Sequence, residues 1–424
     1  MKELQLAASM LDHIVNGGMN FQDAIKAVFP PNSLDKHYQG ATCAFVGCEL
    51  RHFNLIKEVC KNVPNLTSEE VLYLYLAVAN NAFLKKFENE EMIATIKEKF
   101  GDKYTPEIDE IFANTGDLMQ LCKEYEVDSV DYISIRFNTP RWLVKMWQKH
   151  YGKALTFKIL RKNNRQQIQT VRVNTNKVST ADFMAAHPGE FSLSNVEDVL
   201  IYNGKGQVRK TPYFRNFEIF HERLPVKVIV DKVFDIPMGE ALLISAENDS
   251  IVKELYLKAN TNVGVHVAVP DISKRPELLK LERTEKPINM SFFSAPSYLD
   301  MNATVNRKQD LAIVYPESSS FDLIRQYPDY LLRFEHERID QCLAKQKEAL
   351  EGADAFLLEG SKLVYMVNTL NKKETRGSVL NFINEHPNYE LLEEKQFLSF
   401  DDYDTALYYA ILLKKEISEN TSND

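Results

Sequence analysis

Apolar residues recur at three- and four-residue intervals through the first part of the chain, which is the period of an amphipathic helix. Leu4, Leu11 and Ile14 illustrate this spacing, and Gly17-Gly18 marks the end of the first helix. Because no alternating strand pattern occurs before about residue 130, we predict an all-helical domain over residues 1–130. The expected helices cover residues 4–15, 21–28, 45–59, 68–78 (with Ser68 as the N-cap), 92–100 and 107–125.

The pattern becomes mixed over residues 131–225. Pro140 precedes an apolar stripe that runs to Tyr151, and Gly152 ends this predicted helix. Short runs of β-branched and aromatic residues then predict strands over 169–174, 198–202 and 217–220. We therefore predict a small α/β module for this part of the chain.

Strand and helix patterns alternate from residue 226 onward. Such alternation predicts a doubly wound, mostly parallel sheet, a Rossmann-like α/β domain over residues 226–416. We expect a long helix over 339–358 and a disordered polar tail over 417–424. The predicted strands cover residues 241–245, 263–269, 288–293, 310–315, 362–367 and 406–413.

The formal net charge of −9 is unevenly distributed. Residues 136–230 carry 17 Lys and Arg against 6 Asp and Glu, a net charge of +11, whereas residues 1–135 carry −9 and residues 231–424 carry −11. A strongly basic block between two acidic ones predicts a phosphate-binding surface. Two alternatives stay open: a solvated basic face without a ligand, and a face paired with an acidic neighbouring domain.

Composition excludes several other classes. No apolar run approaches the roughly eighteen residues of a transmembrane helix, and the N-terminus is a poor signal peptide. Five cysteines without a CxxC pair predict neither a disulfide framework nor a metal site, so we expect a reducing cytoplasm and no membrane partner. These cysteines are Cys43, Cys48, Cys60, Cys122 and Cys342.

A series of short strings, in order along the chain, resembles the RsmB/Nop/Sun family of RNA cytosine-C5 methyltransferases. The resemblance covers nearly the whole chain and implies a NusB-like helical domain, an RNA-binding module and a Rossmann-like core that uses S-adenosylmethionine. The strings are Gly17-Gly18-Met19, Gly47-Cys48-Glu49-Leu50-Arg51-His52, Pro140-Arg141-Trp142-Leu143-Val144, Val171-Arg172-Val173-Asn174-Thr175, Tyr327-Pro328-Asp329 with Arg333, and Asn384-Glu385-His386-Pro387.

The residues that the family's chemistry requires are missing. Members of this family add a cysteine thiolate to cytosine C6, with help from an aspartate and a second cysteine. Ungapped alignment with the family's Asp-Ala-Pro-Cys segment places Tyr315 at the aspartate and Ser318 at the cysteine, and Asn368 falls at the second cysteine. A serine hydroxyl is a far weaker nucleophile than a thiolate, so we expect Ser318 to be a loop residue.

The cofactor side of the predicted site also departs from the family. Where the family has a glycine-rich loop, residues 246–250 contain no glycine, and Glu247 and Asp249 place negative charge near the expected cofactor carboxylate. Asp271 matches the ribose-binding acid only weakly, because the inserted Pro270 shifts it by one position. S-adenosylmethionine is the cofactor that the resemblance implies, and we expect its binding to be impaired.

The predicted RNA surface is intact. Its phosphate contacts would lose affinity steeply with salt, and Tyr202, Tyr213 and Phe214 are candidates for stacking on unpaired bases. The candidate RNA-binding residues are Arg136, Arg141, Lys145, Arg172, Asn174, Lys177, Arg209 and Lys210.

These observations predict an RNA-binding pseudo-methyltransferase that acts on structured RNA, in ribosomal RNA or the assembling small subunit, with ribosome-assembly proteins as possible partners and no DNA. One alternative is an active S-adenosylmethionine-dependent RNA methyltransferase with a rebuilt site. The other is a protein-interaction module in which the acidic helical domain binds a partner.

Overall fold

The computed structural model describes residues 1–165, 167–204, 206–235, 239–245, 249–259, 262–303, 305 and 308–416. The predicted tail over 417–424 therefore lies outside the described residues. The chain divides into two compact units. One consists of residues 1–166 and 323–335, and the other of residues 167–322 and 336–424. No helix in the described ranges is both long and apolar enough to cross a membrane.

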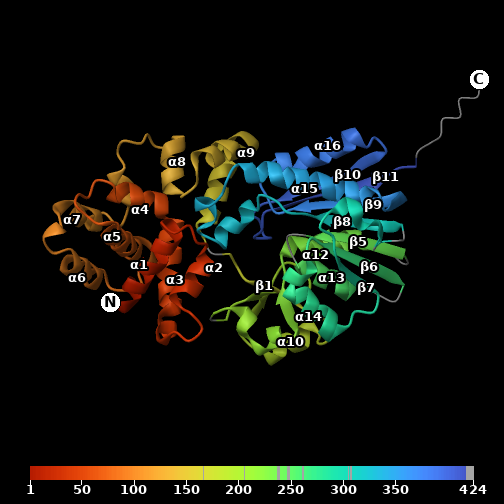
Figure 1. The fold of residues 1–424 in the computed structure, drawn as a ribbon, viewed down its shortest axis with the longest axis horizontal. Helices are drawn as coiled ribbons and strands as arrows, with labels where there is room; N and C mark the ends of the chain where they lie inside the picture. The colour runs from red at the N-terminus through yellow and green to blue at the C-terminus, as the bar shows by residue number, and fades with distance from the viewer. Residues whose placement is uncertain are drawn as a thin grey trace, which may run out of the picture. The chain divides into compact units, whose positions relative to one another are not determined.

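The first unit is helical, as the apolar spacing predicts (Figure 1). Its core includes Leu4, Leu11 and Phe45, all fully buried. Its α-helices are α1 (Lys2–Val15), α2 (Phe21–Val28), α3 (Gln39–Arg51), α4 (Phe53–Cys60), α5 (Ser68–Ala79), α6 (Asn89–Phe100), α7 (Pro106–Ala113), α8 (Val130–Arg136) and α9 (Arg141–Asn163).

Three helix boundaries differ from the sequence prediction. The expected helix over 45–59 is two helices, because the backbone leaves the helical range at His52 (φ −122°, ψ 13°). Thr67, and not Ser68, caps α5, forming a capping box with Glu70. The helix expected over 107–125 ends at Ala113.

In α9, Gly152 adopts φ 76° and interrupts the helix where the sequence predicted an end.

A later segment of the chain, residues 323–335, completes the helical unit. Asp329 is fully buried and accepts a hydrogen bond of 3.1 Å from the backbone N–H of Phe21, in the first turn of α2. Arg333 Nη2 donates to the same carboxylate oxygen over 2.7 Å. The Tyr327-Pro328-Asp329 string thus has a structural role within this unit.

The second unit begins with a four-stranded antiparallel sheet of order β2-β3-β1-β4. Its strands are β1 (Thr170–Val173), β2 (Phe191–Leu193), β3 (Val199–Tyr202) and β4 (Ile219–His221), joined by α10 (Thr180–Ala186) and α11 (Pro212–Arg215). Strand β2 was not predicted, because Phe191-Ser192-Leu193 contains no β-branched residue and is too short to show a period. The α/β character expected for this segment is confirmed.

The same unit contains a seven-stranded sheet of order β10-β11-β9-β8-β5-β6-β7. Strands β5 to β9 run parallel, and β11 pairs antiparallel with β9 and β10. The mostly parallel sheet that the alternating pattern predicts is therefore confirmed. The strands are β5 (Gly239–Ser245), β6 (Val263–Val269), β7 (Met290–Ser294), β8 (Gln309–Tyr315), β9 (Leu357–Val367), β10 (Tyr389–Phe397) and β11 (Leu407–Lys414).

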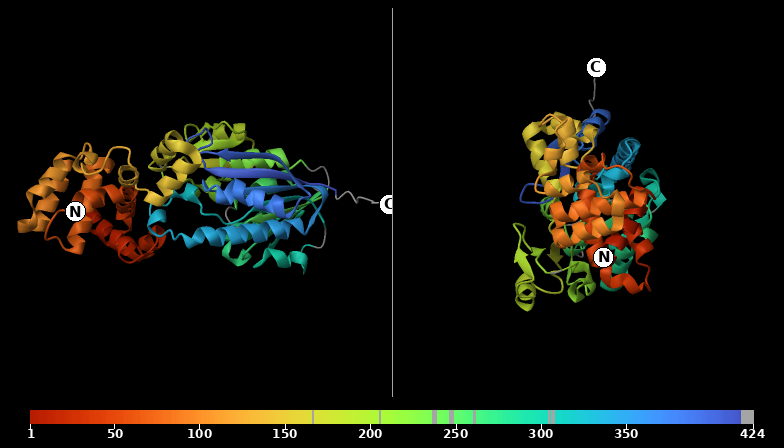
Figure 2. Two further views of the ribbon diagram at one scale, coloured as in Figure 1. Left: turned by 90° about the horizontal axis from the view of Figure 1, so that it is seen from above. Right: turned by 90° about the vertical axis from the view of Figure 1, so that its left-hand side faces the viewer.

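Helices cover both faces of this sheet. Successive strand residues such as Leu242 and Leu243 belong to different cores, one under each set of helices. Figures 1 and 2 show the long helix α15 along one face, with α16 on the same side. The helices are α12 (Leu224–Val233), α13 (Ser250–Lys258) and α14 (Pro276–Glu285) on one face, and α15 (Glu337–Asp354) and α16 (Ser378–Glu385) on the other.

Candidate functional site

The carboxyl ends of β8 and β9 bring together the three positions that the resemblance assigns to catalysis. Tyr315 ends β8 and is fully buried, and its hydroxyl donates to Asn368 Oδ1 over 2.8 Å. Ser318 Oγ lies 3.4 Å from the carbonyl oxygen of Asn368, to which it donates. The three aligned residues therefore lie close together in the fold. The three residues form a hydrogen-bonded set that contains neither a thiol nor a carboxylate.

Glu374 anchors the neighbouring turn. This carboxylate is fully buried, and Ser319 donates to it from its backbone N–H over 2.7 Å and also from its hydroxyl. Asn371 Nδ2 and Gln346 Nε2 donate to the same group over 2.9 and 3.2 Å. Because every one of these donors lies in the interior, the network fixes the segment after β8.

None of the three aligned residues is a cysteine. Ser318 and Ser319 are both fully buried, and their hydroxyls hydrogen-bond within the turn and to the two residues that follow β9, Asn368 and Thr369. Burial raises the pKa of the Cys43 and Cys122 thiols to about 11 and of Cys48 to about 12, and it raises that of Cys60 further. These four cysteines lie in the helical unit and stay protonated at neutral pH.

Two acidic residues at the expected cofactor edge of the sheet, Asp271 and Asp249, already have partners within the protein. The Asp271 carboxylate already accepts from the backbone N–H and the hydroxyl of Ser273, at 3.0 and 2.6 Å, and it pairs with Lys274. These contacts lower its pKa. Asp249 pairs with Arg275 at 2.9 Å, and its pKa is raised because it is buried. The expected loop residues Ala246, Glu247 and Asn248 lie outside the described residues.

No group of three or more His, Cys, Asp or Glu side chains is arranged to hold a metal ion within the described ranges.

Five of the candidate RNA-binding residues have exposed cationic side chains without a buried partner. In the helical unit, Arg136 and Lys145 are exposed, and Arg141 is exposed while paired with Asp131 at 2.6 Å. Lys145 and Lys149 lie one turn apart on α9, on the stripe that Arg141 begins. In the second unit, Arg209 and Lys210 are exposed in the turn before α11.

Lys177 is also exposed but has a partner, Glu285, at 2.8 Å.

Two expected contacts, Arg172 and Asn174, do not lie on the surface. Arg172 is 4% exposed, and its guanidinium pairs with Glu254 at 3.0 Å and Asp198 at 3.2 Å. Asn174 is fully buried and donates from Nδ2 to the carbonyl of Phe217 over 2.8 Å. A side chain held in this way cannot reach a phosphate in solvent, so both residues are structural, and the sequence interpretation is corrected on this point.

Two buried carboxylates could not be predicted from the sequence. Glu374 and Glu254 lie in stretches that read as ordinary polar helix or loop, and only the fold shows that they are buried. The count of charged residues gave no indication that the Arg172 guanidinium pairs with Glu254 inside the protein. In Val171-Arg172-Val173 a basic residue stands between two valines. This pattern could have indicated that Arg172 lies in a strand with both faces covered.

The seven-stranded sheet with helices on both faces defines a Rossmann-like methyltransferase fold. The crystal structure of PH0851 superposes with a TM-score of 0.74 at 16% identity, covering 97% of this chain and 99% of that one. A methyltransferase homolog protein from Pyrococcus horikoshii gives a TM-score of 0.58 at 15% identity, over 69% of this chain and 100% of that one. At these identities the likeness establishes the fold.

Sequence comparisons were made with family models and with known proteins. Residues 139–186 match the model of the ferredoxin-like domain of RsmF/B-like methyltransferases. The chain is 25% identical over 269 residues to a Bacillus subtilis (strain 168) protein named "Probable ribosomal RNA small subunit methyltransferase B". That match covers 62% of this chain and 60% of the relative's length. The resemblance to the RsmB/Sun family that was read from the sequence is confirmed by these two matches.

Proposed function

We propose that this protein binds structured RNA through its basic surfaces and does not transfer methyl groups. The observation that carries the proposal is the hydrogen bond between Tyr315 and Asn368, two of the positions that the family resemblance assigns to catalysis. A tyrosine and an amide that satisfy each other inside the protein supply neither the thiolate nor the acid that cytosine-C5 methylation requires.

The proposed RNA binding rests on the positive charge of exposed surfaces and on the sequence similarity to the Bacillus subtilis relative. Lys145 and Lys149 are exposed on α9, and Arg209 and Lys210 are exposed before α11, within a block of net charge +11. Such a surface binds a phosphate backbone and releases its counterions. The name of the Bacillus subtilis relative refers to small-subunit ribosomal RNA, and we infer that this chain acts on the same class of RNA or on the assembling small subunit.

The domain division is part of the same proposal. We assign residues 1–130 to a NusB-like domain, 131–225 to the RNA-binding module and 226–416 to the methyltransferase-type core. In this assignment the core retains its fold as a scaffold, because the apolar residues of its strands are buried on both faces even though the catalytic positions have changed.

Two measurements on the full chain test the proposal, with the Bacillus subtilis relative run in parallel. Calorimetric titration with S-adenosylmethionine is expected to give no heat up to millimolar concentration. Filter binding to undermethylated small-subunit ribosomal RNA is expected to give salt-dependent affinity, without transfer of radioactive methyl from the cofactor. Micromolar cofactor binding with methyl transfer that Ser318→Ala abolishes would establish an enzyme with a rebuilt site instead.

A further inference from the structure

Two glutamates meet inside the second unit, where β4 of the four-stranded sheet contacts α13. Glu222 directly follows β4, and Glu254 lies on α13. Both residues are buried, with exposed fractions of 3% and 0%. Ser250, one turn before Glu254 on the same face of α13, donates from its hydroxyl to Glu222 Oε1 over 3.0 Å. This contact places the carboxyl group of Glu222 beside that of Glu254.

The two carboxyl groups hydrogen-bond to each other. An ionised carboxylate has no hydrogen to donate, so one member of the pair must hold a proton. The backbone N–H of Arg223 donates to Glu222 Oε1 over 2.7 Å, whereas Glu222 Oε2 accepts from no donor within the described residues. Burial raises the pKa of Glu222 well above 4.5, and the negative charge of Glu254 raises it further. Glu222 is therefore the member that holds the proton.

The charges around the pair lead to the same assignment. Arg172 Nε lies 3.0 Å from Glu254 Oε1, so Glu254 is the glutamate that faces a cation directly. The other charged groups of the cluster are Asp198 in the turn before β3, which pairs with Arg172, Lys227 and Asp231 on α12, which pair with each other, and Lys258 on α13, which pairs with Asp231. These are three cations and two acids, so the cluster is neutral when Glu254 alone of the pair is ionised. Ionising Glu222 as well would leave a net negative charge beside a buried carboxylate, which is unfavourable.

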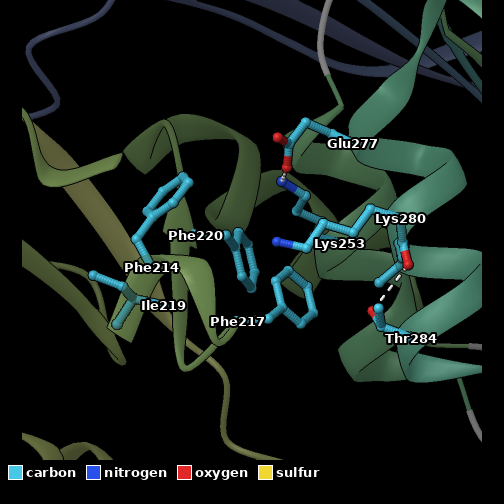
Figure 3. A pocket seen from close by; sticks show the side chains of 9 residues that line it. Phe214, Phe217, Ile219, Phe220, Lys253, Glu277, Lys280 and Thr284 are labelled. Atoms are coloured by element: carbon cyan, nitrogen blue, oxygen red, sulfur yellow. Dashed lines mark hydrogen bonds and ion pairs between the residues drawn. The ribbon is translucent and has the colours of Figure 1, made fainter. Parts of the chain in front are cut away.

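Two further cations near the pair have partners of their own. Lys253 on α13 is buried, and its Nζ lies 3.5 Å from Glu277 on α14 and 5.7 Å from the ring centre of Phe220 (Figure 3). The guanidinium of Arg223 pairs with the buried Asp322. Both cations already balance other charges or rings, so the proton on Glu222 remains the means by which the pair avoids two like charges.

We propose that Glu222 and Glu254 form a pH-sensitive contact that releases the four-stranded sheet from α13 as pH rises. With one proton on the pair, a hydrogen bond joins the end of β4 to α13. Without it, two like charges face each other in the interior, and opening relieves the repulsion by letting water reach both groups. Because opening lets Glu222 release one proton, each pH unit above the ordinary pKa of a glutamate favours the opened form by up to about tenfold.

Native-state hydrogen exchange of the full chain, measured from pH 5 to pH 9, tests this proposal. Protection factors are the quantity to compare, because they already correct for the pH dependence of the exchange chemistry. In the unmodified chain we expect the protection of amides in β4 and α13 to fall with pH, by up to about tenfold per unit. Amides in β11, which lies between β9 and β10, are expected to keep their protection.

Glu222→Gln and Glu197→Gln form a matched pair of variants. In Glu222→Gln the side-chain amide donates to Glu254 at every pH, so the protection of β4 and α13 should no longer depend on pH. Glu197→Gln, at an exposed position before β3, should behave like the unmodified chain. The proposal is overturned if Glu222→Gln keeps the pH profile of the unmodified chain. It is also overturned if protection in the unmodified chain stays constant with pH or falls equally in β11, two outcomes that require no variant to fold.

Discussion

The hydroxyl of Tyr315 donates to Asn368 Oδ1 over 2.8 Å, and thereby joins the carboxyl end of β8 to the residue that follows β9. Both side chains are almost completely buried. The resemblance to the RsmB/Sun family assigns these positions to an acid and a cysteine. Here the hydrogen bond between these two side chains connects the ends of β8 and β9.

Tyr315→Phe is therefore expected to destabilise the protein without affecting RNA binding. The substitution leaves the buried oxygen of Asn368 without this donor, which costs about 1–3 kcal/mol. Urea unfolding followed by circular dichroism measures the loss. Tyr327→Phe, at an exposed tyrosine, is the control and is expected to change the free energy of unfolding by less than about 0.5 kcal/mol. Equal effects of the two substitutions would contradict the structural role assigned to Tyr315.

The parallel core was predictable from the sequence because its strands are buried on both faces. The valine-rich segment Val263–Val269 coincides with β6, because four valines and an alanine within seven residues are typical of a strand in a parallel sheet. Strand β10 (Tyr389–Phe397) was missed for the opposite reason. It is the edge strand of the sheet and contains Glu393 and Glu394, so its composition resembles a polar loop.

The candidate site was predictable in part. Alignment identified Tyr315, Ser318 and Asn368, and the fold brings them together. It did not predict Glu374, because a carboxylate buried among hydrogen-bond donors looks in sequence like any surface glutamate. Arg172 was misassigned for the same physical reason: a charge count records the number of cations in a block but not the direction in which each side chain points.

Arg172→Met is expected to destabilise the second unit by about 3–5 kcal/mol, because it leaves the fully buried carboxylate of Glu254 without its cation. Thermal and urea unfolding measure this loss. Adding Glu254→Leu removes the stranded charge and should restore most of the stability. Arg172→Met is thus unsuitable as a test of RNA contact. A variant that folds with unchanged stability but loses RNA affinity would show that Arg172 does reach the RNA.

Glu49 makes the stability of the helical unit depend on pH. It is fully buried, and neither carboxylate oxygen has a hydrogen-bond partner among the described residues. Burial raises its pKa well above the ordinary 4.5. As pH rises above that ordinary value, the unfolded chain releases this proton while the folded protein retains it. Stability therefore falls with pH through this window, by at most about 1.4 kcal/mol per pH unit.

Glu49→Met should abolish this loss. The variant is expected to be more stable than the parent at pH 8, with a difference that shrinks toward pH 5, in urea unfolding at several pH values. Glu98→Gln, at an exposed position on α6, is the control and should leave the pH profile unchanged. A Glu49→Met variant whose pH profile parallels that of the parent would show that Glu49 does not titrate in this way.

Lys145 and Lys149 provide the cleanest test of the RNA surface on α9. Both are exposed, and within the described residues neither side chain has a hydrogen bond or ion pair, so replacing them removes no structural contact. Lys145→Gln with Lys149→Gln should lower RNA affinity at low salt and reduce the slope of log K against log salt by about 1.4 to 1.8. The control is Lys86→Gln with Lys123→Gln, two exposed lysines in the acidic helical block. If both pairs reduce affinity equally, the attraction follows net charge and is not localised on α9; if neither does, RNA does not bind to this helix.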